Sequence, residues 1–309
     1  MQGEVLIDVK NIKKHYGSIK AVDDISFQVK RGDILGFMGP NGAGKSTAMK
    51  IITCFLQADE GTVEVAGHDT QTQSLAVRQK IGYLPESAPA YGEMTVMGFL
   101  RFVAEARHLP DIPGAIRKVV EMTGLNGVTG QTIETLSKGY KRRVGLAQAL
   151  IHDPEVLILD EPTDGLDPNQ KKMVQDLINH IAHNKAIILS THILDEVEKV
   201  CTRAVVISQG KLLVDSTPEA LIAKAPGHNR IRVELAEADA ALLEQVKAQP
   251  WCKNLQRETE TRFVVVPADG ANHLASLNAL IGDRKVKTLT VIEGRLDDLF
   301  RAMTQEVPA

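Results

Sequence analysis

The chain has 309 residues, 24% of them charged, and a formal net charge of -3 at neutral pH. That length allows a large core and more than one domain, and the slightly acidic balance gives no reason to expect nucleic acid as a partner. The opening residues lack the basic segment and apolar core of a signal peptide, and the apolar runs fall far below the roughly 20 residues of a membrane-spanning helix. Three scattered cysteines without CxxC spacing argue against a metal site or a disulfide framework. We therefore expect a cytoplasmic protein that does not cross a membrane by itself.

A glycine-rich loop follows a predicted buried strand. Residues 32–38, "GDILGFM", favour a strand, and residues 46–56 have the apolar spacing of a helix. Between them, residues 39–46 match the pattern G-x-x-x-x-G-K-S. Glycines let backbone N–H groups wrap a phosphate chain, and the helix N-terminus adds partial positive charge. A dinucleotide fingerprint fails because its third glycine would fall at Thr47, so the expected ligand is a nucleoside triphosphate.

Three side chains of this loop have expected roles. Lys45 can reach the terminal phosphates as a point charge. The Ser46 hydroxyl can bind Mg²⁺, and Thr47 is near enough to touch a phosphate. The predicted triphosphate-binding residues are Gly39, Pro40, Asn41, Gly42, Ala43, Gly44, Lys45, Ser46 and Thr47.

Residues 87 to about 150 are predicted to be helical. Residues 95–109 and 112–125 each carry apolar residues at i, i+3 and i+4. Ser137 suits the N-cap of a further helix, "KGYKRRVGLAQALI", which stops before Pro154. A helix start with serine and glycine is another anion site. The glycine-rich loop at 39–46 already provides for one triphosphate, so this second site is surplus in a monomer. We therefore expect this second cradle to serve the nucleotide of another subunit, in a dimer with ATP trapped between subunits.

Polar side chains end two further predicted strands. The stretch 155–163, "EVLILDEPT", contains an apolar run closed by Asp160 and Glu161, as expected of a buried parallel strand whose carboxyl end faces a ligand. Asp160 is placed to hold Mg²⁺, and Glu161, which points the other way, is the candidate to polarise an attacking water. The run 187–190 is followed by His192. If this strand lies beside the first two, His192 faces the same phosphates, so we expect Glu161 and His192 to be the catalytic residues.

The sequence changes character near residues 224–230, "KAPGHNR", where proline and glycine precede a new apolar alternation, and we place a linker there. From Arg230 the predicted order is strand, helix, strand, strand, helix, strand and a final helix, which is a split βαβ arrangement. The predicted domains are an α/β nucleotide-binding domain, 1–225, and a small α+β accessory domain, 226–309. The accessory domain has no catalytic cluster, and we expect a dimerisation or docking role for it, with a ligand-sensing role as the alternative.

Four motifs, in this order and spacing, resemble the ATP-binding subunit of an ABC transporter: "GPNGAGKST", "LSKGYKRRVGLAQAL", "LILDEPTDGLDP" and "ILSTHILDEVE". The resemblance covers residues 1 to about 225. It implies an ATP-hydrolysing P-loop NTPase core, a helical subdomain at about 87–150 that receives a membrane protein, and a head-to-tail dimer that sandwiches two ATP molecules. It further implies that Tyr16 stacks on adenine and that Asp167 lies at the dimer seam. The implied signature residues, which would contact the partner's ATP, are Ser137, Lys138, Gly139 and Tyr140.

One position departs from the family pattern. Where the family usually has a glutamine after "YLP", this chain has Glu86. A carboxylate accepts hydrogen bonds from Mg²⁺-bound water but cannot donate them as an amide does. We keep Glu86 in the expected metal site with Ser46 and Asp160. The following "PAY" and "MTV" resemble the ABC-2 export branch, which implies a separate ABC-2 membrane permease and a location on the inner face of the cell membrane.

Alternatives from two classes stand beside this interpretation. A soluble ATPase of the same class that moves no substrate would share the four motifs. Its translation forms usually carry two ATPase halves and its repair forms a long coiled coil, and this sequence has one phosphate loop and no such insertion. A P-loop kinase or GTPase would have no use for "LSKGY" or His192. The full set of catalytic residues favours a homodimer, with a heterodimer left open.

Overall fold

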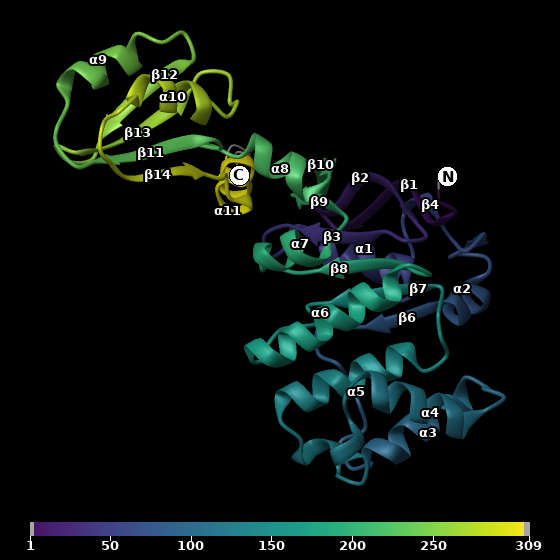
Figure 1. Ribbon diagram of the computed structural model, residues 1–309. Helices are drawn as coiled ribbons and strands as arrows, with labels where there is room; N and C mark the ends of the chain where they lie inside the picture. Colours follow the sequence, from purple (N-terminus) through teal and green to yellow (C-terminus); the bar gives the residue numbers. More distant parts are fainter. Residues whose placement is uncertain (1–2, 306–309) are drawn as a thin grey trace. The chain divides into compact units, whose positions relative to one another are not determined.

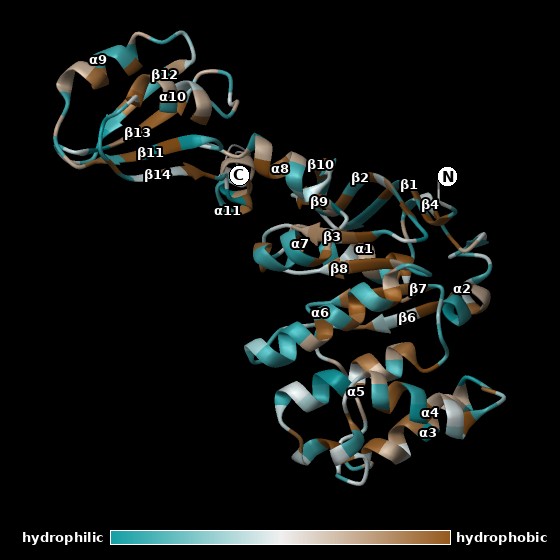
Figure 2. Cartoon of the chain, viewed as in Figure 1, coloured by the Kyte–Doolittle hydropathy of each residue, from teal (hydrophilic) through white to brown (hydrophobic). Residues whose placement is uncertain are grey.

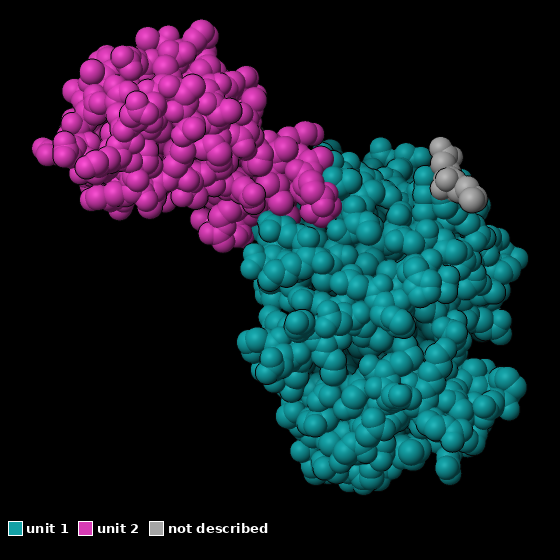
Figure 3. Space-filling view, in the orientation of Figure 1, with its two compact units in different colours: residues 1–217 teal, residues 218–309 magenta. Residues whose placement is uncertain are grey.

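The computed structural model describes residues 3–305, and they form two compact units that divide between Thr217 and Pro218 (Figure 3). The linker predicted at residues 224–230 therefore differs from the observed division. Helix α8 (Pro218–Lys224) packs against α11 (Leu296–Gln305), so it belongs to the second unit although it precedes the proline and glycine. Among residues 3–305, no helix has both the length and the apolar character needed to cross a bilayer.

A six-stranded sheet forms the centre of the first unit (Figure 1). Its strands are β3 (Ile34–Met38), β6 (Ile81–Leu84), β7 (Val156–Asp160), β8 (Ala186–Ser190), β9 (Arg203–Ser208) and β10 (Lys211–Ser216). The order is β10-β9-β3-β8-β7-β6, parallel throughout except for the antiparallel edge strand β10. Every residue of β3, β7 and β8 is buried, as continuous apolar runs require, and Figure 2 shows these strands as hydrophobic. As the sequence predicted, β8 lies beside both β3 and β7.

A second, antiparallel sheet of four strands belongs to the same unit, in the order β2-β1-β4-β5. Its strands are β1 (Val5–Tyr16), β2 (Ile19–Lys30), β4 (Glu60–Val65) and β5 (His68–Asp69). Helix α1 (Lys45–Ile52) contributes Met49 and Ile52 to a core that also contains Val22 of β2 and Phe37 of β3. The helix that follows the glycine-rich loop is therefore anchored between the two sheets. The remaining helices along the central sheet are α2 (Ser74–Lys80), α6 (Pro168–Ala182) and α7 (Leu194–Val200).

Helices fill the chain between β6 and β7, as expected for the helical subdomain. They are α3 (Val96–Ala106), α4 (Ile112–Met122), the short 3-10 turns η1 (Asn126–Val128) and η2 (Ile133–Thr135), and α5 (Lys138–Leu150). Side-chain caps begin the three longer helices: Thr95 accepts from the N–H of Gly98, Asp111 from Gly114, and Ser137 from Tyr140. Helices α3 and α4 pack on each other and both contact α5.

The second unit is a split βαβ domain, as the sequence predicted. After α8 it contains β11 (Arg230–Leu235), α9 (Ala240–Lys247), β12 (Cys252–Arg257), β13 (Arg262–Pro267), α10 (Leu274–Ile281), β14 (Val286–Ile292) and α11. The sheet order is β12-β13-β11-β14, and all its pairs are antiparallel. Val233 and Phe263 of the sheet share a core with Leu242 of α9 and Leu277 of α10.

Candidate nucleotide site

The glycine-rich loop joins β3 to α1, and two of its glycines are required by their surroundings. A Cβ on Gly39 would lie 2.4 Å from the carbonyl oxygen of Ile207. Gly44 has a φ of +106°, and a Cβ there would lie 2.2 Å from the carbonyl oxygen of Ala21. Only glycine fits the space at both positions, and at Gly44 it also fits the left-handed backbone, so the neighbouring strands fix the shape of the loop.

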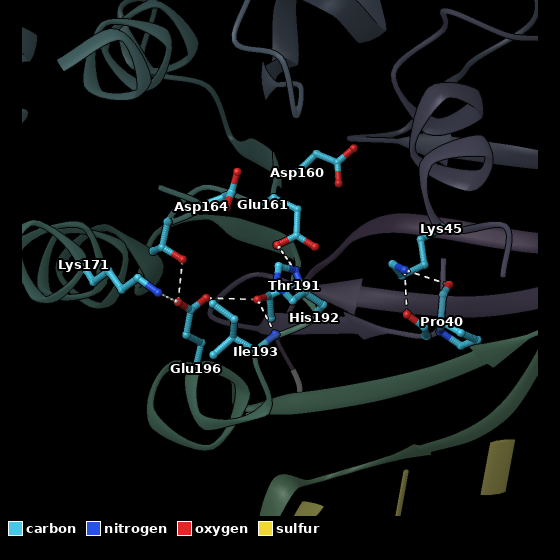
Figure 4. Close-up of polar contacts among 12 residues, drawn as sticks. Pro40, Lys45, Asp160, Glu161, Asp164, Lys171, Thr191, His192, Ile193 and Glu196 are labelled. Atoms are coloured by element: carbon cyan, nitrogen blue, oxygen red, sulfur yellow. Dashed lines mark hydrogen bonds and ion pairs between the residues drawn. The ribbon is translucent and has the colours of Figure 1, made fainter. Parts of the chain in front are cut away.

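Lys45 begins α1 and turns its ammonium group back into the loop (Figure 4). Its Nζ donates to the carbonyl oxygens of Gly39, at 2.7 Å, and Pro40, at 3.1 Å. No side chain of the described residues caps this helix, so its first N–H groups are open to an acceptor. The loop thus gathers an ammonium group and helix N–H groups in one place, an arrangement that suits a polyphosphate.

Burial lowers the pKa of Lys45, while the charges of Glu161, Asp160 and Glu86 oppose that shift. The fold therefore brings these three predicted carboxylates within electrostatic reach of the loop lysine. Asp160 is buried at the end of β7, whereas Glu86 is exposed after β6 and Ser46 is exposed at the start of α1. Carboxylate and hydroxyl oxygens are the ligands that Mg²⁺ prefers, so the residues present fit this metal.

Glu161 and His192 meet at the ends of β7 and β8. Nδ1 of His192 lies 2.9 Å from Oε2 of Glu161, and the Glu161 N–H donates to the carbonyl oxygen of Ser190 at 3.0 Å. Burial raises the pKa of Glu161, and the hydrogen bond with His192 partly offsets this. Glu161 also has a φ of +51°, a left-handed backbone that costs a non-glycine residue roughly 1–2 kcal/mol. Its carboxylate is thus half-buried, hydrogen-bonded and held in a strained backbone that directs it away from Asp160 (Figure 4).

Arg142 of α5 is a site residue that sequence reasoning missed. Its guanidinium donates to the carbonyl oxygens of Pro85, at 3.0 Å, and of Glu86, Asp160 and Glu161. Arg142 is only 5% exposed. One side chain of the helical subdomain therefore ties the Glu86 loop to the end of β7. The available signal was the run of three basic residues, 141–143, followed in the same helix by mostly small and apolar residues.

The predicted signature residues lie beside the start of α6 in the same chain. Lys138 Nζ is 2.8 Å from the Asp164 carboxylate, and a Cβ on Gly139 would lie 2.3 Å from Oε1 of Gln170. Asp167 caps α6, accepting from the N–H groups of Asn169 and Gln170. This places the signature and Asp167 together on one part of the surface.

Two aromatic candidates take different positions. Tyr16 ends β1 and is 51% exposed, with Lys14 Nζ 5.9 Å from its ring centre. Its ring is therefore accessible to a planar partner. Tyr140 instead stacks against Arg143 of its own helix, 4.0 Å from the guanidinium carbon to the ring centre.

This architecture, a phosphate loop in a parallel sheet with a helical subdomain inserted between β6 and β7, defines a P-loop ATPase. Residues 22–164 match the family model described as "ABC transporter". The Nod factor export ATP-binding protein I of Burkholderia orbicola (strain AU 1054) is 34% identical, and the alignment covers 84% of this chain and 86% of that protein. The linearmycin resistance ATP-binding protein LnrL of Bacillus subtilis (strain 168) is 30% identical over 97% of this chain and 98% of the relative.

The fold agrees with these relatives. A solved structure titled "Structure of ATP binding subunit of ABC transporter" is 28% identical, covers 71% of this chain and 92% of its own, and superposes with a TM-score of 0.66. The chain belongs to the ABC transporter ATP-binding proteins, and it is an ATPase. The family and the P-loop fold inferred from the four sequence motifs are confirmed.

Proposed function

We propose that this chain is the ATP-hydrolysing subunit of an ABC-2 type exporter and drives a separate membrane permease from the cytoplasmic face. Relatives named for Nod factor export and for linearmycin resistance support an export role. The LnrL alignment spans nearly the whole of both chains, so it includes the accessory unit. In this proposal the separate permease selects the transported substrate, so this sequence does not identify that substrate.

The observation that carries the proposal is the contact between Glu161 and His192. The Glu161 carboxylate in this contact also lies within electrostatic reach of Lys45. In this proposal the phosphate loop, through Lys45, binds the triphosphate, and Tyr16 stacks on its adenine. Ser46, Asp160 and Glu86 would hold Mg²⁺, which neutralises phosphate charge when bound. Glu161 orients and polarises the attacking water, because its carboxylate is fixed and poorly solvated.

His192 has two roles in the proposal. Its Nδ1 holds the carboxylate of Glu161. The His192 side chain is 60% exposed, so the other edge of its ring is accessible to the γ-phosphate. Ser137, Lys138, Gly139 and Tyr140 would contact ATP bound to a second copy, with Asp167 at the seam. The chain carries both the phosphate loop and the signature residues, so we infer that two copies form a head-to-tail homodimer.

Exposed apolar residues on the helical subdomain support a permease contact. Tyr91, Met97 and Phe102 are 54%, 37% and 44% exposed, and Tyr91 packs edge-on against Phe102 with ring centres 5.5 Å apart. Exposed apolar groups of this kind mark interaction sites on soluble surfaces. Here they lie on and beside α3, on the subdomain that the family resemblance assigns to the membrane partner.

The test is affinity purification of the tagged chain from detergent-solubilised membranes of its host, with mass spectrometry of the co-purifying proteins. We expect one stoichiometric multi-span membrane protein. A Phe102→Glu variant should lose that protein while its ATPase rate stays within about twofold of wild type. Recovery of the wild-type chain only from the soluble fraction, bound to ribosomes, DNA or nothing, would instead establish the non-transport ATPase of the same class.

A further inference from the structure

A buried carboxylate on α7 joins the loops that carry Glu161 and His192. Oε1 of Glu196 accepts from the Thr163 hydroxyl at 2.5 Å. Its Oε2 accepts from the Thr191 hydroxyl at 3.0 Å (Figure 4). Nζ of Lys171, on α6, lies 3.8 Å from Oε1. Glu196 is 3% exposed. One side chain therefore links the loop after β7, the loop after β8 and helix α6.

Each of the two threonines lies close in the chain to one member of the catalytic pair. Thr163 follows Glu161 by two residues, and Thr191 immediately precedes His192. Both threonines are almost fully buried, at 3% and 1% exposed. The Thr191 hydroxyl also accepts from the N–H of Ile193 at 3.0 Å, so it bonds to the backbone on the far side of His192. A shift of Glu196 would therefore move both loops that hold the Glu161–His192 contact.

Stability alone does not account for an ionisable residue here. Helix α7 already buries the apolar side chains of Val197 and Val200. The carboxylate of Glu196 has two neutral hydroxyl donors and an ammonium partner no closer than 3.8 Å, so its burial brings a desolvation cost that an apolar residue would avoid. What an apolar side chain could not do is accept from two hydroxyls on two different loops. What the carboxylate adds is therefore that it holds those two loops in a fixed position relative to each other.

We propose that Glu196 is a positioning residue for ATP hydrolysis, which keeps the His192 loop in register with the Glu161 loop. It acts through Thr163 and Thr191 and does not touch nucleotide. The inference rests on the catalytic roles proposed above for Glu161 and His192. It predicts that loss of the bridge slows hydrolysis and leaves ATP binding in place, because the phosphate loop makes none of these contacts.

The experiment compares Glu196→Ala, Glu196→Gln and Thr191→Val with wild type, measuring kcat, KM for ATP and the Kd of ATPγS. Glu196→Ala should lower kcat by about tenfold or more, about 1.4 kcal/mol, with KM and Kd within about twofold. Glu196→Gln should recover most of the rate, since its amide can accept from one hydroxyl and donate to the other. Thr191→Val keeps the shape of the side chain and should fall between the two.

The matched control is Thr123→Val. Thr123 is also fully buried, and its hydroxyl donates to the carbonyl oxygen of Val119 at 2.6 Å within the helical subdomain. It should keep the wild-type kcat whatever it loses in thermal stability. Equal losses of kcat in Thr123→Val and Thr191→Val, or full activity in folded Glu196→Ala, would overturn the positioning role. If Glu196→Ala does not fold, the Thr191→Val and Glu196→Gln rates decide by the same criteria.

A double-variant cycle separates this inference from the function beneath it. If Glu196 acts through the His192 loop, adding Glu196→Ala to His192→Ala should slow hydrolysis much less than Glu196→Ala slows wild type. If the double variant instead loses the product of the two single-variant losses in kcat, the positioning role of Glu196 is overturned and the catalytic roles are not. Full activity of His192→Ala and Glu161→Gln would instead overturn the proposed catalytic roles.

Discussion

Nδ1 of His192 lies 2.9 Å from Oε2 of Glu161, although the two residues are 31 positions apart in the chain. The contact exists because β7 and β8 are parallel neighbours whose register pairs Asp160 with Ser190. Residues that follow two such strands emerge at the same edge of the sheet. The left-handed backbone of Glu161 then turns its carboxylate toward the histidine.

Glu161→Gln should abolish steady ATP turnover, lowering kcat by at least about 10²-fold, the usual size of a general-base contribution. The amide retains the size and polarity of the carboxylate, so ATP binding should persist. In the homodimer that we propose, hydrolysis reopens the subunits, so size-exclusion chromatography of this variant with ATP should show a stable dimer that is absent without nucleotide. A Glu161→Gln protein that turns over at the wild-type rate would remove this residue from its assigned role.

Lys45→Ala should weaken ATP binding by about tenfold or more, because it removes a charge-assisted contact worth about 1.5–3 kcal/mol. Lys50→Ala is the control, since Lys50 lies on the exposed side of the same helix. Titration of both variants with a fluorescent ATP analogue measures the difference. Equal affinities for the two variants would contradict the assignment of the loop.

Glu86→Gln should leave the ATPase rate of the isolated subunit within about tenfold, about 1.4 kcal/mol. The backbone carbonyl of Glu86, which Arg142 holds, is unchanged by the substitution, and an amide oxygen can still accept from metal-bound water. The measurement is kcat at saturating Mg²⁺ and ATP. A larger loss would show that the carboxylate takes a direct chemical part.

His152 should make folding stability depend on pH. Burial lowers its pKa from 6.5 to about 4, and its Nε2 lies 3.0 Å from the carbonyl oxygen of Ile81. Between these values the unfolded chain binds the proton and the folded chain does not. Stability should therefore fall as the pH drops from 6.5 towards 4, by on the order of 3 kcal/mol.

Urea unfolding at pH 7 and pH 5 tests this contribution of His152. His152→Gln should lose some stability at pH 7, but its unfolding midpoint should fall less between the two pH values than that of wild type. The same acid sensitivity in both proteins would assign it to other groups.

The sequence by itself determined the features that are local in the chain. The phosphate loop, the Ser137 cap, the buried strands and the order of elements in the second unit are each encoded by residues a few positions apart, in patterns whose physics is short-range. Buried parallel strands also placed Asp160, Glu161 and His192 at one sheet edge, because the carboxyl ends of such strands meet there.

Only the tertiary structure decided which distant side chains meet. Arg142 reaches two loops from a helix that precedes β7, and Glu196 bridges Thr163 and Thr191 from a helix that follows β8. Both residues lie within quoted motifs, but neither motif indicates which distant backbone or side-chain groups they contact. The division after Thr217 likewise depends on α8 packing against α11, some 70 or more residues later in the chain. These contacts follow from strand order and helix packing, which a linear pattern of residue types does not specify.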